Sequence, residues 1–306
     1  MDGGLDRFLR NKLSQRCEDA IRGDAMKLVT FSTRERIEKP GYLLEESGEV
    51  LDLSGCYKST LQVIQSSDAT PSDAARFPLH EVRLHAPIRN PPRIFCIGLN
   101  YRDHAIESRL EIPKFPVVFF KMTPSIIGPD EAIVLPRETA EPDYEAEMAV
   151  VIGKGGYRIS AEAAMEHVYG YTILNDVSAR DVQFSTSQWS LSKSLPTFCP
   201  MGPAIVTKDE IADPHALRIR LEINQECMQD SKTSELIFRV PELIEYISSL
   251  TPLLPGDVIS TGTPSGVGFA RVPQRWLRDG DQVSITIEGL GTLNNPVTTE
   301  ENPRSL

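Results

Sequence analysis

The chain has 306 residues, of which 40% are hydrophobic and 25% are charged, and its formal net charge at pH 7 is -11. This length suffices for one large domain or two ordinary ones with an ample core. The acidic balance argues against a nucleic-acid-binding protein, which would need a basic face. No apolar run is long enough to span a bilayer, so a membrane-spanning protein is not expected either.

The N-terminal part is predicted to contain an extension, a small domain and a linker. Apolar residues recur at helical spacing in residues 1–25, which indicates an amphipathic helix; a surface helix or a poorly ordered extension with no function of its own is preferred over a functional segment. The acidic residues there are atypical of a transit peptide. Residues 26–85 are expected to form a small β-rich domain, because MKLVTFS, GYLLE and GEVLDLS predict short strands. The proline-rich segment PIRNPPR predicts an extended linker over residues 86–93.

Residues 94–298 are expected to form the main domain, followed by a short tail over residues 299–306. Strands are predicted at RIFCIGL, VVFFK, EMAVVIG, YGYTILND, AIVT, LRIRLEI, DVISTG and QVSITIEGLG, and helices at AEAAMEHVY and VPELIEYISSL. Strands and helices do not alternate regularly, so a doubly wound sheet or an α/β barrel is not expected. The predicted class is a mixed, β-rich α+β fold with a few covering helices.

The cysteines bear on the compartment. The chain has five, an odd number, and none of them forms a CxxC pair. This pattern predicts neither a zinc site nor a disulfide framework. A reducing, cytoplasmic compartment is therefore expected.

The stretch PDYEAEMAVVIG combines acidic residues with an apolar run typical of a strand buried on both faces. As a strand it places Asp143, Glu145 and Glu147 on one face, since side chains alternate with period two. Burying unpaired carboxylates is costly, and two oxygen ligands side by side suit a hard cation such as Mg²⁺ or Mn²⁺. We predict Glu145 and Glu147 as ligands and Asp143 at the rim. A solvated acidic face is the alternative.

A third ligand is expected at the end of another strand. Asp176 follows the run YGYTILN, so its carboxylate can point into a site, although Asn-Asp is also a common turn. The polar residues Arg180, Asp181 and Gln183 come soon after it. They favour a functional site over a simple turn.

The segment RIFCIGLNYRDHAIES predicts a strand followed by a helix, with Asp103 as a candidate N-terminal cap. His104 and Glu107 lie three residues apart and share one helix face. A carboxylate beside a histidine can orient the ring and raise its basicity, which suits a general base that acts on water. A surface ion pair is the alternative.

Two further segments attract attention. Lys193 lies in QWSLSKSLPTFCPMGP, where it could stabilise an enolate or be an ordinary loop lysine. The segment STGTPSGVG, residues 260–268, follows a strand, and its glycines could let backbone approach a ligand closely. Neither this segment nor GKGG at 153–156 is a Walker A loop, which needs Gly-Lys-Ser/Thr.

Together these motifs resemble the fumarylacetoacetate hydrolase family over residues 26–298. GLNYRDHAIES, DYEAEMAVVIG, GYTILNDVSARDVQ, KSLPTFCPMGPAIVT and TGTPSGVG occur in the family's order, and GLGTLNNPV closes the set. The bacterial-type acylpyruvases and 2,4-diketo-3-deoxy sugar-acid hydrolases are the more similar members. The resemblance implies a mixed β-sheet roll with a small N-terminal domain, a catalytic domain at 94–298 and a homodimer.

The resemblance also implies roles for individual residues. The implied metal ligands are Glu145, Glu147 and Asp176, with Mg²⁺ as the expected ion and Mn²⁺ or Ca²⁺ as alternatives; the implied catalytic residues are His104, Glu107 and Lys193; the implied substrate contacts are Arg180, Gln183 and Thr263. One departure concerns Pro196, which stands where members often have an acid, and proline lacks an N–H donor. The loop that carries Lys193 is therefore expected to differ.

The implied activity is metal-dependent hydrolysis of a C–C bond in a 1,3-dicarbonyl 2-oxo acid, such as an acylpyruvate, through an enolate stabilised at the metal. Oxaloacetate decarboxylation and 2-hydroxy-diene-dioate isomerisation proceed through the same kind of enolate, so both remain alternatives. A non-catalytic metabolite binder is the alternative from another class, prompted by Pro196. A nucleotide-binding protein is a weaker one.

Overall fold

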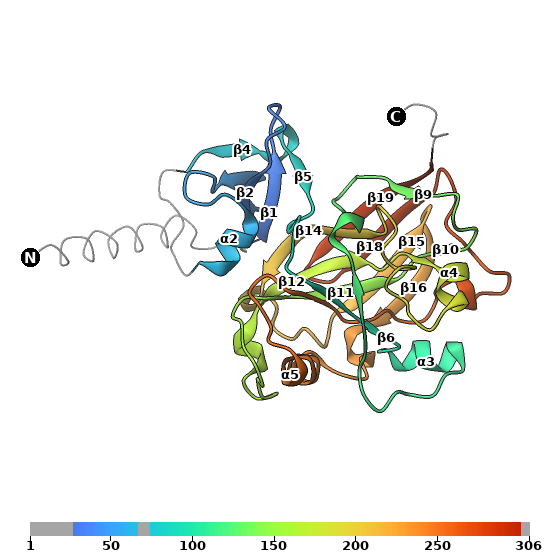
Figure 1. Ribbon diagram of the computed structural model, residues 1–306. Coiled ribbons are helices and arrows are strands. Elements are labelled where there is room, and N and C mark those ends of the chain that lie inside the picture. The colour runs from blue at the N-terminus through green and yellow to red at the C-terminus, as the bar shows by residue number, and fades with distance from the viewer. Residues whose placement is uncertain (1–26, 67–73, 301–306) are drawn as a thin grey trace, which may run out of the picture.

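The computed structural model describes residues 27–66 and 74–300 (Figure 1). The helix expected over residues 1–25 and most of the expected tail lie outside the described residues. Strands dominate the described chain and helices are few, which confirms the mixed, β-rich α+β class. None of the helices in the described ranges is long and apolar enough to cross a membrane.

The N-terminal strands form a small lobe that packs beside the rest of the molecule (Figure 1). Its elements are β1 (Lys27–Ser32), β2 (Lys39–Leu44), β3 (Glu49–Asp52), α2 (Thr60–Gln65), β4 (Arg76–Pro78) and β5 (Arg83–His85). Residues 86–93, where we expected a linker, contain no helix or strand. The hydroxyls of Thr30 and Thr60 both donate to the carbonyl of Pro87, which fixes the start of this segment against the lobe.

One large sheet runs through both the lobe and the main part of the chain. Its order is β4-β3-β2-β1-β14-β12-β11-β17-β6-β7, and β5 and β8 pair at its side with β1 and β14. The strands from the main part are β6 (Ile94–Gly98), β7 (Val117–Lys121), β8 (Ile126–Ile127), β11 (Ala146–Ile152), β12 (Val168–Asn175), β14 (Cys199–Thr207) and β17 (Val258–Ser260). The two parts are joined by the antiparallel pairing of β1 with β14, in which Lys27 faces Val206 and Leu28 faces Ile205.

A second sheet of five strands has the order β16-β15-β18-β19-β9. Its strands are β9 (Ile133–Leu135), β15 (Arg218–Ile223), β16 (Glu226–Lys232), β18 (Gln282–Ile287) and β19 (Gly291–Thr299). A short pair, β10 (Pro142–Asp143) and β13 (Ser178–Ala179), forms a third sheet. The stretch 142–153 is therefore not one strand, because the chain leaves β10 and enters β11 in a different sheet.

Few helices accompany these sheets. The α-helices besides α2 are α3 (Arg102–Ser108), α4 (Arg180–Ser185) and α5 (Val240–Leu250); the 3-10 turns are η1 (Leu79–Glu81), η2 (Thr123–Ser125), η3 (Ala164–His167), η4 (Lys208–Glu210), η5 (Thr233–Glu235) and η6 (Gly268–Ala270). The helix expected at VPELIEYISSL is α5. The helix expected at AEAAMEHVY was wrong, because only η3 forms there and Val168 already pairs with Ile152 in the large sheet.

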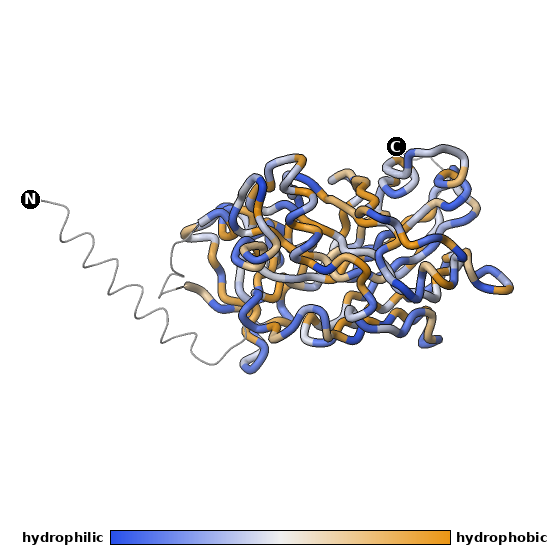
Figure 2. The backbone as a smooth tube through the Cα atoms, turned by 90° about the horizontal axis from the view of Figure 1, so that it is seen from below, coloured by the Kyte–Doolittle hydropathy of each residue, from blue (hydrophilic) through white to orange (hydrophobic). Residues whose placement is uncertain are grey.

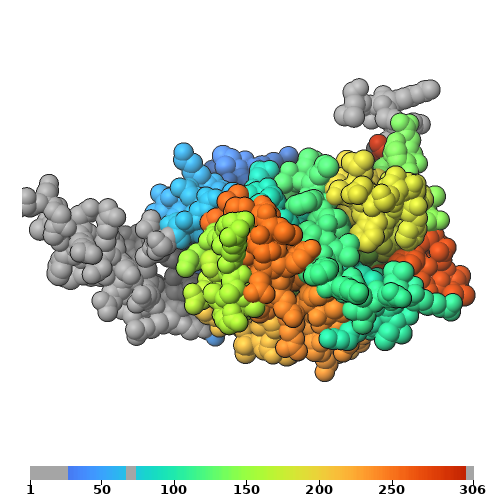
Figure 3. Space-filling view, turned by 60° about the horizontal axis from the view of Figure 1, so that its bottom comes forward, coloured from blue at the N-terminus to red at the C-terminus, as the bar shows by residue number. Residues whose placement is uncertain are grey.

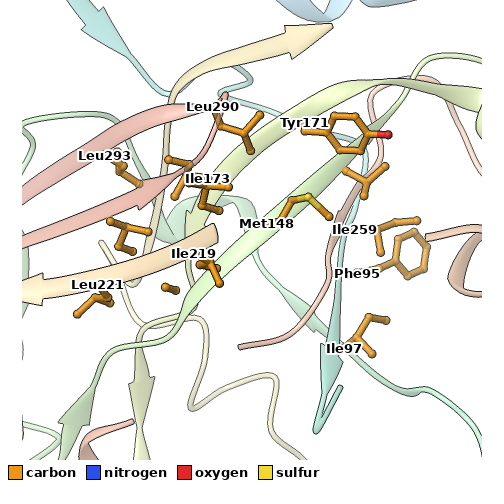
Figure 4. Packing of buried hydrophobic residues seen from close by; sticks show 14 of the residues in the cluster. Phe95, Ile97, Met148, Tyr171, Ile173, Ile219, Leu221, Ile259, Leu290 and Leu293 are labelled. Carbon is orange, nitrogen blue, oxygen red and sulfur yellow. The ribbon is translucent and has the colours of Figure 1, made fainter. Parts of the chain in front are cut away.

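The core lies on both faces of β11, whose seven residues are all buried. Met148 and Val150 point into the larger hydrophobic cluster, which includes Ile219 and Leu293 from the second sheet (Figure 4). Ala149 and Val151 point the other way, into a cluster that contains Leu28 and Tyr42 of the lobe. Apolar segments gather accordingly in the interior of the trace, and hydrophilic ones are frequent in the outer loops (Figure 2).

Asn100 connects the residues before α3 to two distant loops. It is fully buried, its Nδ2 donates to Phe238 O at 3.0 Å and to Thr261 O at 2.7 Å, and its Oδ1 accepts from Phe238 N at 2.8 Å. Asn100→Ala leaves these groups without partners, so we expect the free energy of unfolding to fall by about 2–4 kcal/mol in urea titrations. Asn90→Ala, at an exposed position, is the control. Equal effects of the two would refute this role.

Candidate metal centre and active site

Glu145, Glu147 and Asp176 come together where β11 begins and β12 ends. Asp176 N donates to Glu145 O at 2.9 Å, and Glu145 N donates to Asn175 Oδ1 at 3.0 Å, so the two strand ends are tied to each other. All three carboxylates are buried, and each offers one oxygen within 4.8 Å of the others. The structure thus brings together the three predicted metal ligands.

Two buried lysines neutralise part of this charge. Lys193 Nζ lies 2.7 Å from Glu145 Oε2 and 2.8 Å from Asp176 Oδ2, so the ammonium group bridges two of the carboxylates. Lys121 Nζ lies 2.6 Å from Asp176 Oδ1 and donates to Val177 O at 3.1 Å. The exposed Pro196 does not displace Lys193 from the carboxylates.

Arg180 completes the group of cations. Its Nη2 lies 2.6 Å from Glu145 Oε1, and its Nε lies 2.8 Å from Asp143 Oδ2. The prediction that Asp143 lies at the rim was wrong, because Asp143 has no exposed surface. Burial is tolerated because the guanidinium and several backbone N–H groups satisfy the carboxylate.

The segment 260–268 holds carboxylates with backbone N–H groups and one serine hydroxyl. Glu147 Oε2 accepts from Ser260 Oγ at 2.5 Å and from Gly262 N at 3.0 Å. Gly266 N donates to Glu107, and Gly268 N donates to Asp143 at 2.7 Å. These donors bind the protein's own acids, which argues against the alternative of a phosphate-binding loop.

The electrostatics of the three carboxylates fit a divalent cation. Burial by itself raises the pKa of Glu145, but the charges of Lys193 and Arg180 outweigh it and lower the pKa to about 2. The pKa of Glu147 is raised well above its usual value, first by burial and then by the charges of Asp176 and Glu145. Three hard oxygen donors in one buried group match the ligand set that Mg²⁺, Mn²⁺ or Ca²⁺ prefers.

His104 and Glu107 lie beside this cluster on α3. His104 Nδ1 and Glu107 Oε2 are 3.4 Å apart, and both oxygens of Glu107 are 3.0 Å from Gly266 N. His104 is buried, and it lies close enough to Glu145 to influence the pKa of that carboxyl, after Lys193 and Arg180. A surface ion pair is thereby excluded for this histidine. A pair fixed in this way can hold or move a proton next to the carboxylates.

The cap of α3 differs from our expectation. Tyr101 is the N-cap residue and Asp103 lies in the first turn. Asp103 instead accepts from His104 N at 2.7 Å and from Ser231 Oγ at 2.6 Å, so its carboxylate anchors α3 to β16. On the surface, the segment that contains α3 (teal) borders those of α4 (yellow) and residues 269–278 (orange-red) (Figure 3).

The remaining predicted contacts are buried near the centre. Gln183 Oε1 accepts from Arg180 Nη1 at 2.8 Å. The Thr263 hydroxyl donates to Ala146 O at 2.9 Å and accepts from Gln229 Nε2 at 2.8 Å, so it supports the start of β11. A direct contact of Thr263 with substrate stays a prediction.

The sequence alone predicts no role for Lys121. A signal was present, since period two in VVFFK places Lys121 on the same face as Phe119, which is buried. A lysine at an inward position of a strand needs a charged partner. Asp143 and Ser260 carried no comparable signal, because their roles depend on contacts with residues far away in the sequence.

Known proteins share this chain's sequence and fold. The family model described as fumarylacetoacetate (FAA) hydrolase C-terminal matches residues 93–298. The mitochondrial oxaloacetate tautomerase fahd2 of Xenopus laevis is 43% identical over 288 residues, covering 89% of this chain and 90% of its own length. The oxaloacetate tautomerase YisK of Bacillus subtilis is 49% identical over 225 residues, covering 72% and 75% respectively.

Solved structures agree with this assignment. A fumarylacetoacetate hydrolase from Exiguobacterium antarcticum has a TM-score of 0.81 and 37% identity, and a 2-hydroxyhepta-2,4-diene-1,7-dioate isomerase from Mycobacterium marinum has 0.76 and 37%. The matches cover 90% and 91% of this chain, respectively, and 100% of each solved chain. The fold expected from the resemblance is confirmed. The family match, the relatives that cover most of the chain and the carboxylate cluster lead to one conclusion: this chain belongs to the fumarylacetoacetate hydrolase family of enzymes.

Proposed function

We propose that this enzyme forms the enolate of a 2-oxo acid and that its reaction is the keto–enol tautomerisation of oxaloacetate. The observation that carries the proposal is the buried cluster of three carboxylates with Lys193 and Arg180 in contact and the His104–Glu107 pair beside it. The choice of oxaloacetate is supported by the names of relatives that match most of the chain.

The roles of the residues follow from their chemistry. Glu145, Glu147 and Asp176 would hold a divalent cation, with Mg²⁺ as the favoured ion, and this cation would polarise the oxygens of the 2-oxo acid when bound. His104, oriented by Glu107, takes the proton from C3 of the keto form and returns it in the reverse direction. Lys193 stabilises the negative charge that develops on the C2 oxygen, and this oxygen then takes a proton from solvent to give the enol.

A second candidate is hydrolysis of the C–C bond of an acylpyruvate, the activity first expected from the sequence. It is favoured by the fixed His104–Glu107 pair, which suits removal of a proton from water as well as from carbon. Decarboxylation of oxaloacetate needs the same enolate without an attacking water. These reactions differ in product, so one set of assays separates them.

The test is a panel of oxaloacetate, acylpyruvates and diketo sugar acids with Mg²⁺ or Mn²⁺, and with EDTA as the control. We expect the metal-loaded enzyme to accelerate the enol-to-keto conversion of oxaloacetate. The conversion is measured as the loss of enol absorbance. Acylpyruvate cleavage without tautomerisation would favour the hydrolase, and release of carbon dioxide the decarboxylase. If the metal-loaded protein turned over none of these compounds, the result would favour the alternative of a non-catalytic metabolite binder.

We propose further that the enzyme is a homodimer. β7 is the last strand of the large sheet and exposes Val117 and Phe120, and exposed apolar side chains on an edge strand favour contact with a second chain. Light scattering in solution would test this. The cytoplasmic compartment stays a prediction from cysteine usage, whereas the relative from Xenopus laevis is named as mitochondrial.

A further inference from the structure

Asp143 is a buried carboxylate of the site that lies outside the three-carboxylate cluster. Its Oδ1 accepts from Tyr144 N at 2.9 Å and from Gly268 N at 2.7 Å. Its Oδ2 accepts from Arg180 Nε at 2.8 Å and from Phe269 N at 3.1 Å. Four hydrogen bonds leave this acid little capacity for a metal ion, so its role lies in what it holds.

Arg180 is the group that Asp143 holds. Each nitrogen of its guanidinium has a different acceptor: Nε contacts Asp143, Nη1 contacts Gln183 and Nη2 contacts Glu145. Because the guanidinium is planar, two of these contacts already fix its plane. Among residues 27–66 and 74–300, no protein acceptor contacts the second N–H of either terminal nitrogen, so each keeps the capacity for one more hydrogen bond.

Asp143 also fixes the ring that lies against Arg180. The Cζ atom of Arg180 is 4.6 Å from the ring centroid of Phe269, and the ring of His104 meets Phe269 edge to face at 6.3 Å. The backbone just before Phe269 packs closely against the backbone of Arg275, since a Cβ on Gly268 would lie 2.1 Å from Arg275 O. One carboxylate therefore fixes both the cation and the aromatic wall beside the base.

We propose that Asp143 is a positioning residue that orients Arg180 to bind the substrate carboxylate, without itself taking part in metal binding. This inference rests on the proposed function, because it assigns the free N–H groups of Arg180 to a 2-oxo acid. Without the Asp143 charge, Glu145 is the one carboxylate left in contact with the guanidinium among the described residues. Arg180 then loses the contact that fixes its plane on this side, and its unpaired N–H groups no longer face the substrate carboxylate.

The test compares Asp143→Asn with Asp181→Asn. Asp181 is a matched control, because it is also an aspartate with several hydrogen bonds, on the helix of Arg180, but its partners are Thr139, Ala140 and Val182. Calorimetry on the full chain measures Mg²⁺ affinity and then the affinity of the Mg²⁺-loaded protein for oxalate, a stand-in for the 2-oxo carboxylate. Steady-state assays on oxaloacetate measure kcat and KM.

We expect Asp143→Asn to weaken oxalate binding by about 10-fold, which corresponds to one charge-assisted hydrogen bond, and to lower kcat by about 10²-fold through misplacement. Mg²⁺ affinity should stay within about threefold, and Asp181→Asn should match the wild type. In the double variant with Arg180→Lys, which cannot keep all three contacts, Asp143→Asn should add little to the loss from Arg180→Lys alone.

Three results would overturn the inference: unchanged oxalate affinity in Asp143→Asn, Mg²⁺ affinity that falls in step with it, or losses that multiply in the double variant. If Asp143→Asn does not fold, Arg180→Lys alone must weaken oxalate binding with Mg²⁺ affinity retained, or the inference fails. Absence of turnover in the wild type would count against the proposed function only, because oxalate binding is measured without turnover.

Discussion

Glu147→Gln is expected to lower metal-dependent turnover on the order of 10³-fold, because it removes one of the three proposed ligands of a cation that would contribute several kcal/mol to catalysis. The amide keeps the shape of the acid and can still accept from Ser260 and Gly262. The variant should therefore fold, yet Mg²⁺ should no longer raise its melting temperature. Thermal unfolding with and without Mg²⁺, together with the oxaloacetate assay, measures both effects.

The pKa of Glu147 gives this variant a second signature. Burial and the neighbouring acids raise its pKa above the ordinary value of 4.5 in the folded, metal-free protein. The folded state then binds more protons than the unfolded state, so wild-type stability falls as pH rises above 4.5. Glutamine has no such proton to lose, and metal-free Glu147→Gln should be at least as stable as the wild type at pH 7.

Glu226→Gln is the control for Glu147→Gln, since Glu226 is exposed in β16. It should leave turnover and the effect of Mg²⁺ unchanged. Full turnover by Glu147→Gln, or an undiminished rise in melting temperature with Mg²⁺, would show that Glu147 is not a ligand.

His104→Ala is expected to lower kcat by about 10²- to 10⁴-fold, the range for loss of a general base, while Mg²⁺ affinity stays at the wild-type value. Turnover and Mg²⁺ affinity should respond differently because His104 contacts Glu107 and Phe269 and does not belong to the group of proposed metal ligands. Calorimetry with Mg²⁺ and the steady-state assay give the two numbers for one sample.

His80→Ala, at an exposed position in η1, is the matched control and should behave as the wild type. Glu107→Gln should show a smaller loss than His104→Ala, because the imidazole remains but loses its charged partner. If Mg²⁺ affinity collapsed together with turnover in His104→Ala, the histidine would be a metal ligand and the role proposed for it would be wrong.

Local pattern explains what the sequence predicted well. Seven buried residues in β11 follow from an unbroken apolar run, and α5 follows from apolar residues at helical spacing. Glu145 and Glu147 were predictable because two carboxylates next to such a run need a counter-charge. The resemblance to a family then supplied Asp176 and Lys193, whose own surroundings left alternatives open.

Contacts between distant segments explain what was missed. Asp143 was placed at the rim because nothing near it in sequence offers a partner, whereas its donors lie at Arg180, Gly268 and Phe269. The helix expected at AEAAMEHVY does not form because Val168 pairs with Ile152 in the large sheet, and a helical Val168 could not make this pairing. Period and propensity describe neighbours along the chain and carry no information on such pairings.

The shared core behind β11 has a consequence for truncation. Glu147 lies on the same face of β11 as Ala149 and Val151, and these pack in one cluster with Leu28 and Tyr42 of the N-terminal lobe. By packing on this face, the lobe helps to keep water away from the strand that carries Glu147. It thereby lowers the local dielectric constant and strengthens the electrostatic interactions of the site. A chain shortened to residues 94–298 would keep every proposed catalytic residue and still expose that apolar backing to solvent.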